Sequence, residues 1–391
     1  MQSNINRYYT TTEEHADKLP AKEWDELANE NVYMTHGWLR TLERTLIESP
    51  RPLYVLVCDS GRLLGCAVCY AQKKEDRLLG IDDPLLGRFK HVFPRLGMSF
   101  RPALVSPLRF AARCPILIRQ DLSSKDRAQV LDRLLIEIEK HAVSHKLSTA
   151  FSTTSEDCEI NTALQDRGYI QAMDIPIAYL DITWKDFSGY LSYLRKMSRN
   201  EAKSVKRQIN KNRRAGVSIK NVHSLGGPDN TLMHLFRLNH FKYERGPFKY
   251  KDSLLRELKS NLGEHTVIKM ASKNSQPIGA SVTLTKGDVN SQMLIGIDHA
   301  LSRDDLTYFN LNIYEEIKGA ISSGSKRIYF GQGAYYLKIR RGCKVIDTYT
   351  YFKPVGLRHH IMTRLWFPIL SAWVKAKLPD WIHRNHEAGC K

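Results

Sequence analysis

The sequence predicts an α/β protein made of two similar halves, each with a mixed sheet. Two alignments within the chain support this prediction. VLVCDSGRLLGCAVCYA, from Val55, aligns with VIKMASKNSQPIGASVTLT, from Val267, and EKHAVSHKLSTAFSTT aligns with IKGAISSGSKRIYFGQG. Each half then has two strands around a turn, a further strand, a helix and a strand. A repeat of this length indicates a duplicated domain rather than a solenoid.

Length and composition fit this organisation and point to an anionic partner. A chain of 391 residues is long enough for two domains, and 42% apolar with 26% charged residues is typical of a globular protein. The net charge of +18 predicts attraction to polyanions. Nucleic acid, phosphorylated small molecules, an acidic carrier protein and an anionic membrane surface all fit this charge.

Several classes of function leave no trace in the sequence. The motifs of dinucleotide-binding, P-loop, zincin and nucleophile-elbow enzymes are missing. Cys66 and Cys69 have no second cysteine pair for zinc, and His359-His360 have no ligand partners at metal spacing, so we expect no metal and no tightly bound cofactor. Seven scattered cysteines and a polar start predict a reduced, cytoplasmic protein.

In the first half, Pro20 precedes a helical stretch, AKEWDELANE, and HGWLRTLERTLIE is a second one. PLYVLVCDSGRLLGCAVCYAQ predicts two strands around a turn, with Gly65 inside the second. CPILIR is a strand after a loop-rich region, and SSKDRAQVLDRLLIEIEKHAVSHK is a helix capped by Ser123 or Ser124. STAFSTT and IAYLDITW are strands on either side of a short helix, INTALQDRGY.

The second half repeats this order after two helices, TLMHLFRLNHFKYE and DSLLRELKSN. HTVIKMASKNSQPIGASVTLTKG predicts two strands around a turn, with Gly279 inside the second. The strand SQMLIGIDHA leads to a helix, FNLNIYEEIKGAISSG, and then to the strand RIYFGQG. YYLKIRRGCK alternates in polarity, so Lys338 and Arg340 would share one face of a strand. IDTYTYFK is the last strand.

A basic helix joins the two halves, within the stretch from Phe187 to Lys220. Its apolar side is predicted to hold Leu191, Leu194, Met197, Ala202, Val205 and Ile209. Arg195, Arg199, Lys203, Lys206 and Arg207 lie on the opposite side, and Glu201 is the only acid of the stretch. The positive face therefore predicts an anion outside the helix, although a solvated surface helix would show the same pattern.

The order of motifs resembles a known group of enzymes. SFRPALVSP, then DFSGYLSYLRKMSRNEAKSVKR, then a late element with Gly331, Gln332, Gly333, Lys338, Arg341 and Gly342, resemble the bacterial tandem-acyltransferase family labelled for peptidoglycan biosynthesis or recognition. The resemblance covers the chain from about Trp24 to Pro354. Tyr335-Tyr336 stand near the place where that family usually has Glu-His, and the spacing is one residue longer.

This resemblance implies two tandem Gcn5-related N-acyltransferase (GNAT) domains of the Fem type, which carry an aminoacyl group from transfer RNA to an amine. We expect a first domain over residues 1–185, a second over 186–356 that includes the basic helix at 187–214, and an amphipathic, aromatic tail over 357–391. The expected donor is aminoacyl-transfer RNA, and the acceptor is a small-molecule amine. The rival donors are an acyl-coenzyme A and an acyl group on an acidic carrier protein.

Acyl transfer to an amine needs groups that accept and donate protons and groups that hold the carbonyl and the donor. We expect the catalytic residues to be Asp298, Tyr308, Tyr335, Tyr336 and Lys338. The donor would be bound by Arg195, Arg199, Lys203, Lys206, Arg207, Gln332, Arg340 and Arg341, and the acceptor by Tyr243, Glu244 and Arg245. Each has a structural alternative: a turn cap for Asp298, packing for the tyrosines and a solvated edge strand for the late cations.

The reacting centre is expected in the second half, between Asp298 and the segment from Gln332 to Arg341. The corresponding part of the first half, STTSEDCEINTALQ, has acids but no clustered cations for an anionic donor. His299 follows Asp298 and is expected to be a surface loop histidine.

A non-enzymatic alternative is a protein that binds nucleic acid or a membrane surface on folds that have lost their chemistry. LWFPILSAWVKAKLPDWIHR would suit weak peripheral membrane contact through its tryptophans and lysines. The same stretch would also suit packing against the body of the protein. Pro368 and Lys375 interrupt its apolar run, so a bilayer span is not expected.

Overall fold

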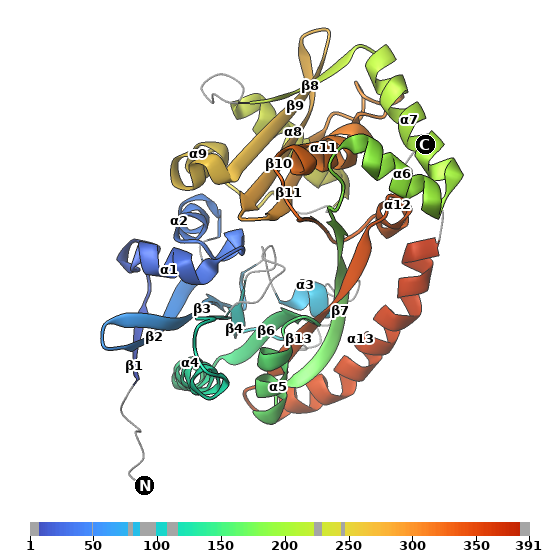
Figure 1. The fold of residues 1–391 in the computed structure, drawn as a ribbon. Helices are drawn as coiled ribbons and strands as arrows, with labels where there is room; N and C mark the ends of the chain where they lie inside the picture. Colours follow the sequence, from blue (N-terminus) through green and yellow to red (C-terminus); the bar gives the residue numbers. More distant parts are fainter. Residues whose placement is uncertain are drawn as a thin grey trace. The chain divides into compact units, whose positions relative to one another are not determined.

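The computed structural model describes residues 8–48, 50–76, 81–86, 99–107, 116–222, 229–243 and 247–383. The chain divides into two compact units. The first consists of Met1–Glu43, Glu48–Pro176 and Ile346–Asp380, and the second of Arg44–Ile47, Ile177–Val345 and Trp381–Lys391. Each unit contains its own part of the repeated order of strands and helices (Figure 1).

The first unit contains a mixed sheet covered by helices. Its strands are β1 (Tyr9–Glu13), β2 (Arg51–Asp59), β3 (Arg62–Gln72), β4 (Ala103–Ser106), β5 (Ile116–Ile118) and β6 (Ser148–Thr154), with most of β13 (Lys344–Lys353). They pair in the order β1-β2-β3-β4-β6-β13, with β5 also beside β3, and β4 and β6 are the parallel pair. The helices are α1 (Ala21–Ala28), α2 (His36–Thr45), α3 (Asp82–Leu86), α4 (Ser124–Ser144), α5 (Cys158–Asp166) and α13 (Leu357–His383).

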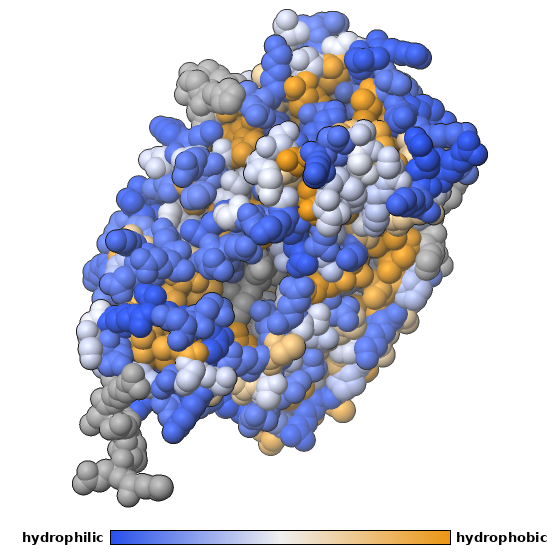
Figure 2. Space-filling model, viewed as in Figure 1, coloured by the Kyte–Doolittle hydropathy of each residue, from blue (hydrophilic) through white to orange (hydrophobic). Residues whose placement is uncertain are grey.

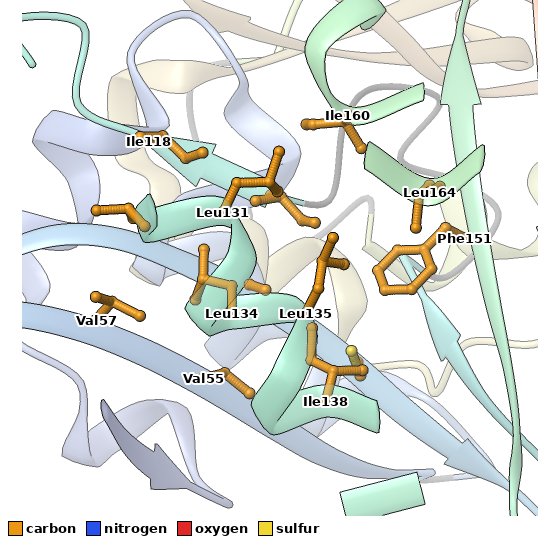
Figure 3. Packing of buried hydrophobic residues seen from close by; sticks show 14 of the residues in the cluster. Val55, Val57, Ile118, Leu131, Leu134, Leu135, Ile138, Phe151, Ile160 and Leu164 are labelled. Carbon is orange, nitrogen blue, oxygen red and sulfur yellow. The ribbon is translucent and has the colours of Figure 1, made fainter. Parts of the chain in front are cut away.

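Helix α4 packs its apolar stripe against the sheet, and this packing forms the core of the first unit. Ser123 caps it, with its Oγ accepting from the backbone N–H of Asp126, as the sequence predicts. Figure 3 shows leucines and an isoleucine of α4 pointing toward β2, β6 and α5. The labelled members of this buried cluster are Val55, Val57, Ile118, Leu131, Leu134, Leu135, Ile138, Phe151, Ile160 and Leu164.

The second unit repeats the same sheet order. Its strands are β8 (Val217–Asn221), β9 (Thr266–Lys273), β10 (Gln276–Lys286), β11 (Val289–Ile297) and β12 (Arg327–Gly331), with the end of β7 (Ile170–Asp181). They pair in the order β7-β12-β11-β10-β9-β8, and β11 and β12 are the parallel pair. The helices are α6 (Phe187–Met197), α7 (Arg199–Arg214), α8 (Asp229–Tyr243), α9 (Leu254–Leu262), α10 (Thr307–Phe309), a π-helix (Asn310–Tyr314), α11 (Glu315–Ser322) and α12 (Tyr335–Arg340).

The duplication predicted from sequence is visible strand by strand. The hairpin β2-β3 corresponds to β9-β10, and the parallel pair β4-β6 corresponds to β11-β12. The final strand of each sheet is exchanged: β13, late in the chain, pairs antiparallel with β6, and β7, from the earlier part, pairs antiparallel with β12. The α/β class with mixed sheets is therefore confirmed.

A glycine at the same place in each repeat lets a helical segment approach the sheet. A Cβ on Gly65 of β3 would lie 2.5 Å from Cγ1 of Val130 in α4. A Cβ on Gly279 of β10 would lie 3.0 Å from Cδ1 of Ile297 and 3.2 Å from Cδ2 of Leu311, which belongs to the π-helix. Both distances are shorter than ordinary carbon contacts, so both positions favour glycine.

Three local predictions were wrong. The basic segment is two helices, because Ser198 is extended (φ −158, ψ 119) and ends α6 before α7 begins. Met197, expected on the apolar side, is consequently 53% exposed. The segment with Lys338 and Arg340 is helix α12 and not a strand, so these two residues point to different sides.

Candidate active site

The parallel strands β11 and β12 of the second unit pair over three residues and then separate. Their ladder runs from Val289 opposite Arg327 to Ser291 opposite Tyr329 and ends there. β11 continues to Ile297, and β12 continues to Gly331. Carboxyl ends of neighbouring parallel strands are a common place for ligands in α/β proteins, and here they separate.

The irregularity of β11 lies at this point of separation. The register with β10 shifts between Val282 opposite Leu294 and Thr283 opposite Gln292, so Met293 is an extra residue in β11. Bulges of this kind redirect backbone groups and are frequent beside active sites. Residues 292–295 are all half-buried, whereas the paired residues 289–291 are buried. The strand thus becomes accessible where it leaves β12.

Helix α8 packs directly against β11 beyond the bulge. A Cβ on Gly296 would lie 2.6 Å from both the carbonyl carbon of Leu235 and the backbone nitrogen of Phe236. These are backbone atoms, so a side chain at Gly296 has no room without moving α8. The glycine therefore sets how closely α8 packs against β11, next to the half-buried residues 292–295.

One group of predicted site residues lies at the end of β11. Asp298 caps the following turn, because its Oδ1 accepts from the N–H groups of Ala300 (2.9 Å) and Leu301 (3.1 Å). Nε2 of His299 lies 3.4 Å from Oδ1 of Asn239, and its ring contacts that of Tyr243 edge-on. Burial, and then the charge of Lys242, lowers the pKa of His299.

Tyr308 also lies with the group at the end of β11, because it packs against an apolar cluster. It packs against Ala271, Ile278, Ile297 and Leu311. Burial raises the pKa of its hydroxyl to about 12, so the hydroxyl holds its proton at neutral pH. Tyr243 is 56% exposed at the end of α8. Glu244 and Arg245, the other expected acceptor residues, lie outside the described residues.

The second group follows β12, where Gly331 and Gly333 turn the chain with positive φ. Lys338 is buried, and its Nζ donates to the carbonyl oxygens of Phe330 (2.8 Å), Gly331 (3.2 Å) and Gln332 (3.1 Å). Desolvation lowers the pKa of Lys338 to about 8. This lysine therefore holds the turn between β12 and α12 from the inside.

The other expected residues of this group are divided between surface and interior. Gln332 is exposed in the turn. Tyr335 is buried, with its ring stacked on Trp381 at 6.0 Å between centroids. Tyr336 is half-buried, and its hydroxyl accepts from Nη1 of Arg340.

Arg340 and Arg341 both form ion pairs with one carboxylate of α7, Glu201. Its Oε1 accepts from Nε of Arg340 at 2.6 Å, and its Oε2 accepts from Nη1 of Arg341. Arg341 also donates to the hydroxyl of Tyr314 (2.9 Å) and to Oε1 of Gln208 (3.1 Å). The side chain of Arg341 is 4% exposed, so it is not available to a donor, in contrast to the sequence expectation.

Sequence reasoning missed Glu201, Gln208 and Tyr314 as parts of this network. Glu201 could have been found from the sequence, because it is the single acid of an otherwise basic helix. The structure explains it as a buried carboxylate that pairs with Arg341. Tyr314 gave none, since its role depends on the π-helix that brings its hydroxyl to Arg341.

The segment from Thr307 to Tyr314 connects the two groups. Tyr308 packs with the end of β11, while the hydroxyl of Tyr314 contacts Arg341 after β12. Between them, the backbone carbonyl of Asn312 accepts from Nε2 of Gln292, the first residue of β11 beyond the ladder (2.9 Å). Oδ1 of Asn312 is buried and, among the described residues, has no hydrogen-bond partner. Isolated π-turns are frequent at functional sites, and an unsatisfied buried polar atom is rare enough in a folded protein to need an explanation.

The five cations of α6 and α7 that are predicted to bind the donor are all on the surface. Arg195 of α6 and Arg199, Lys203, Lys206 and Arg207 of α7 are exposed. Figure 2 shows hydrophilic side chains over α7. Lys211, Arg213 and Arg214 extend this basic face toward the end of the helix, and they are also exposed.

Comparison with known proteins agrees with this architecture. Residues 15–371 match the FemAB-like family, described as peptidoglycan biosynthesis/recognition. No curated protein matches the sequence. Among solved structures, FemX is similar with a TM-score of 0.58 and 9% identity, over 91% of this chain and 99% of that one.

Two further structures show the same fold at low identity. The C-terminal domain of a putative lysylphosphatidylglycerol synthetase from Agrobacterium fabrum has a TM-score of 0.54 and 10% identity, over 90% of this chain and 96% of that one. L-PGS from Bacillus licheniformis has a TM-score of 0.51 and 11% identity, over 89% and 96%. The chain therefore belongs to the FemAB-like family and has the fold that FemX has.

Proposed function

We propose that the protein is an N-acyltransferase, which forms an amide bond between an activated acyl or aminoacyl group and an amine. The separation of β11 from β12 beside a bulge carries this proposal. Backbone N–H groups on an open strand edge are donors for a carbonyl oxygen that gains negative charge when the amine attacks. The corresponding pair in the first unit, β4 and β6, lacks the clustered cations that follow β12.

The residues around this separation include groups that can transfer protons. The amine nitrogen bonds to the acyl carbon and loses a proton, and the bond between the acyl carbon and the carrier breaks, so the carrier oxygen or sulfur gains a proton. We assign proton acceptance to Asp298 and donation to Tyr308, whose raised pKa keeps its hydroxyl protonated. Tyr243 would contact the acceptor, and Lys338 holds the turn that carries Gln332 and Tyr336.

Aminoacyl-transfer RNA is the donor that the basic face supports best. Exposed cations on α6 and α7 suit a phosphate backbone, and the net charge of +18 favours association with it. An acyl-coenzyme A or an acyl carrier protein would need only a small basic patch and is the second candidate. Arg340, on the surface beside Tyr336, would serve either donor.

Turnover with alternative donors tests the proposal. The protein is incubated with labelled aminoacyl-transfer RNA or with acyl-coenzyme A, each with a panel of amines, and amide products are measured by mass spectrometry. We expect product with aminoacyl-transfer RNA, loss of product after RNase treatment, and affinity falling by roughly one power of salt concentration per phosphate contacted. Turnover that survives RNase would favour the thioester donor, and no product with any donor would favour a binding protein without chemistry.

A pair of charge variants tests the basic face itself. Lys203→Gln with Arg207→Gln removes two charges from α7, while Lys125→Gln with Lys140→Gln removes two exposed charges from α4. We expect the α7 variant to bind transfer RNA more weakly and with a shallower salt dependence, and the α4 variant to bind as the wild type does. Equal loss in both would show only a net-charge effect.

A further inference from the structure

Helix α13 exposes a continuous row of large apolar side chains. Leu357 is 75% exposed, Ile361 51%, Leu365 67%, Ile369 57% and Trp373 42%. They recur every four residues, so they form one ridge that winds slowly round the helix. Figure 2 shows hydrophobic side chains among hydrophilic ones along the border of the molecule where α13 runs in Figure 1.

The ridge is separate from the face by which α13 is attached. Phe367, Leu370 and Val374 are buried in the first unit, and Phe367 packs against Phe352. Nε1 of Trp366 donates to the backbone carbonyl of Leu85 at 2.6 Å. The expected packing against the protein body is thus present, and it leaves the ridge on the outside. Helix α13 is apolar on both sides: one side is buried against the first unit, and the ridge side is exposed.

The charged residues of α13 are almost all positive. Arg358, Arg364 and Lys375 are exposed on α13, and Asp380, near its end, is the single acid of the helix. The same sign applies to the whole chain, with its net charge of +18. Apolar side chains with cations beside them and almost no acids match an anionic lipid surface, where acyl chains take the ridge and headgroups take the cations.

We propose that α13 docks the protein on an anionic membrane surface, with its ridge in the boundary between headgroups and acyl chains. Among the described residues no helix is long and apolar enough to cross a bilayer, so the contact is peripheral. A second copy of this chain is the rival occupant of the ridge. It fits less well, because two such helices would bring their cations together without acids to pair them.

Vesicle flotation tests this docking with the full chain. We compare phosphatidylcholine vesicles with and without phosphatidylglycerol, using wild type, Leu365→Ser with Ile369→Ser, and a control, Ile136→Ser with Val143→Ser. The control residues lie on α4 and are 45% and 71% exposed, similar to the two ridge residues. We expect wild type and control to float with phosphatidylglycerol, and the ridge variant to partition at least about tenfold less. Thermal denaturation of each variant checks that it is folded.

A second measurement places the helix in the bilayer. Lipids with brominated acyl chains quench tryptophan fluorescence at short range, and Trp373 is the tryptophan of the ridge. We expect quenching on vesicle binding that falls in Trp373→Phe, while flotation is retained because phenylalanine is also apolar. Absence of flotation, or equal flotation of the ridge variant, would overturn the proposal. So would a dimer in wild type that becomes a monomer in the ridge variant without any vesicle binding.

Discussion

A buried arginine needs a counter-charge, and Arg341 has one in Glu201. The two side chains are 4% and 9% exposed, so neither is solvated enough to remain charged alone at low cost. We predict that Glu201→Gln lowers the free energy of unfolding by about 3–5 kcal/mol, because the variant leaves Arg341 charged and buried. Urea denaturation measures this loss. Glu137→Gln, which breaks a pair with the exposed Lys140 on α4, should change stability by less than about 1 kcal/mol.

The structural role of Asp298 as a turn cap can be tested separately from a role in proton transfer. An asparagine keeps the side-chain oxygen that caps the turn but cannot take up a proton. We predict that Asp298→Asn reduces turnover by about a hundredfold or more while the melting temperature stays nearly unchanged. Asp298→Ala should lower both. Wild-type turnover of the asparagine variant would restrict Asp298 to its role as a cap.

The burial of Lys338 makes the free energy of unfolding depend on pH. Its folded pKa of about 8 is below the ordinary value of 10.5, so unfolding takes up a proton between these pH values. Rising pH therefore disfavours unfolding in this window. We predict that the stability difference between wild type and Lys338→Met shifts in favour of wild type by about 3 kcal/mol between pH 8 and 10.5. A constant difference would mean that the three carbonyls keep the ammonium at its ordinary pKa.

At the scale of elements, periodicity predicted most helices and strands, and backbone detail decided the rest. Alternation and turn residues fix hairpins such as β9-β10, because each strand has one buried face. The segment of Lys338 and Arg340 alternates in the same way but is helical, because Gly331, Gly333 and Ala334 turn the chain with positive φ before it. Neither the break at Ser198 nor the π-helix produces a distinct spacing of apolar residues. The sequence pattern therefore predicts neither of them.

The close contact of α8 with β11 gives a stability test. We predict that Gly296→Ala costs about 1–3 kcal/mol or more, because the new Cβ meets backbone atoms of α8 that cannot rotate away. Gly279→Ala, whose Cβ meets the ends of two flexible side chains, should cost less. Denaturant midpoints compare the two. If the two variants were equally stable, α8 would move freely over this strand.

At the scale of the molecule, the sequence reveals the duplication because each half must bury its own sheet with the same pattern. It also predicts a site in the second half, since the cations and the end of SQMLIGIDHA are there. It does not show that Arg341 is internal or that β11 leaves β12 after Ser291. Those facts depend on contacts between segments distant in sequence, such as α7 with the end of α12.

Hydrogen–deuterium exchange with bound carrier tests most directly whether the donor binds where β11 and β12 separate. Exchange is followed by mass spectrometry for the free protein and after addition of uncharged transfer RNA or coenzyme A. We predict that one carrier slows exchange in the peptides of residues 289–298 and 327–333, because it covers an open strand edge. Peptides of β4 and β6 should exchange unchanged. Protection confined to β4 and β6, or no protection by either carrier, would contradict a reacting centre in the second unit.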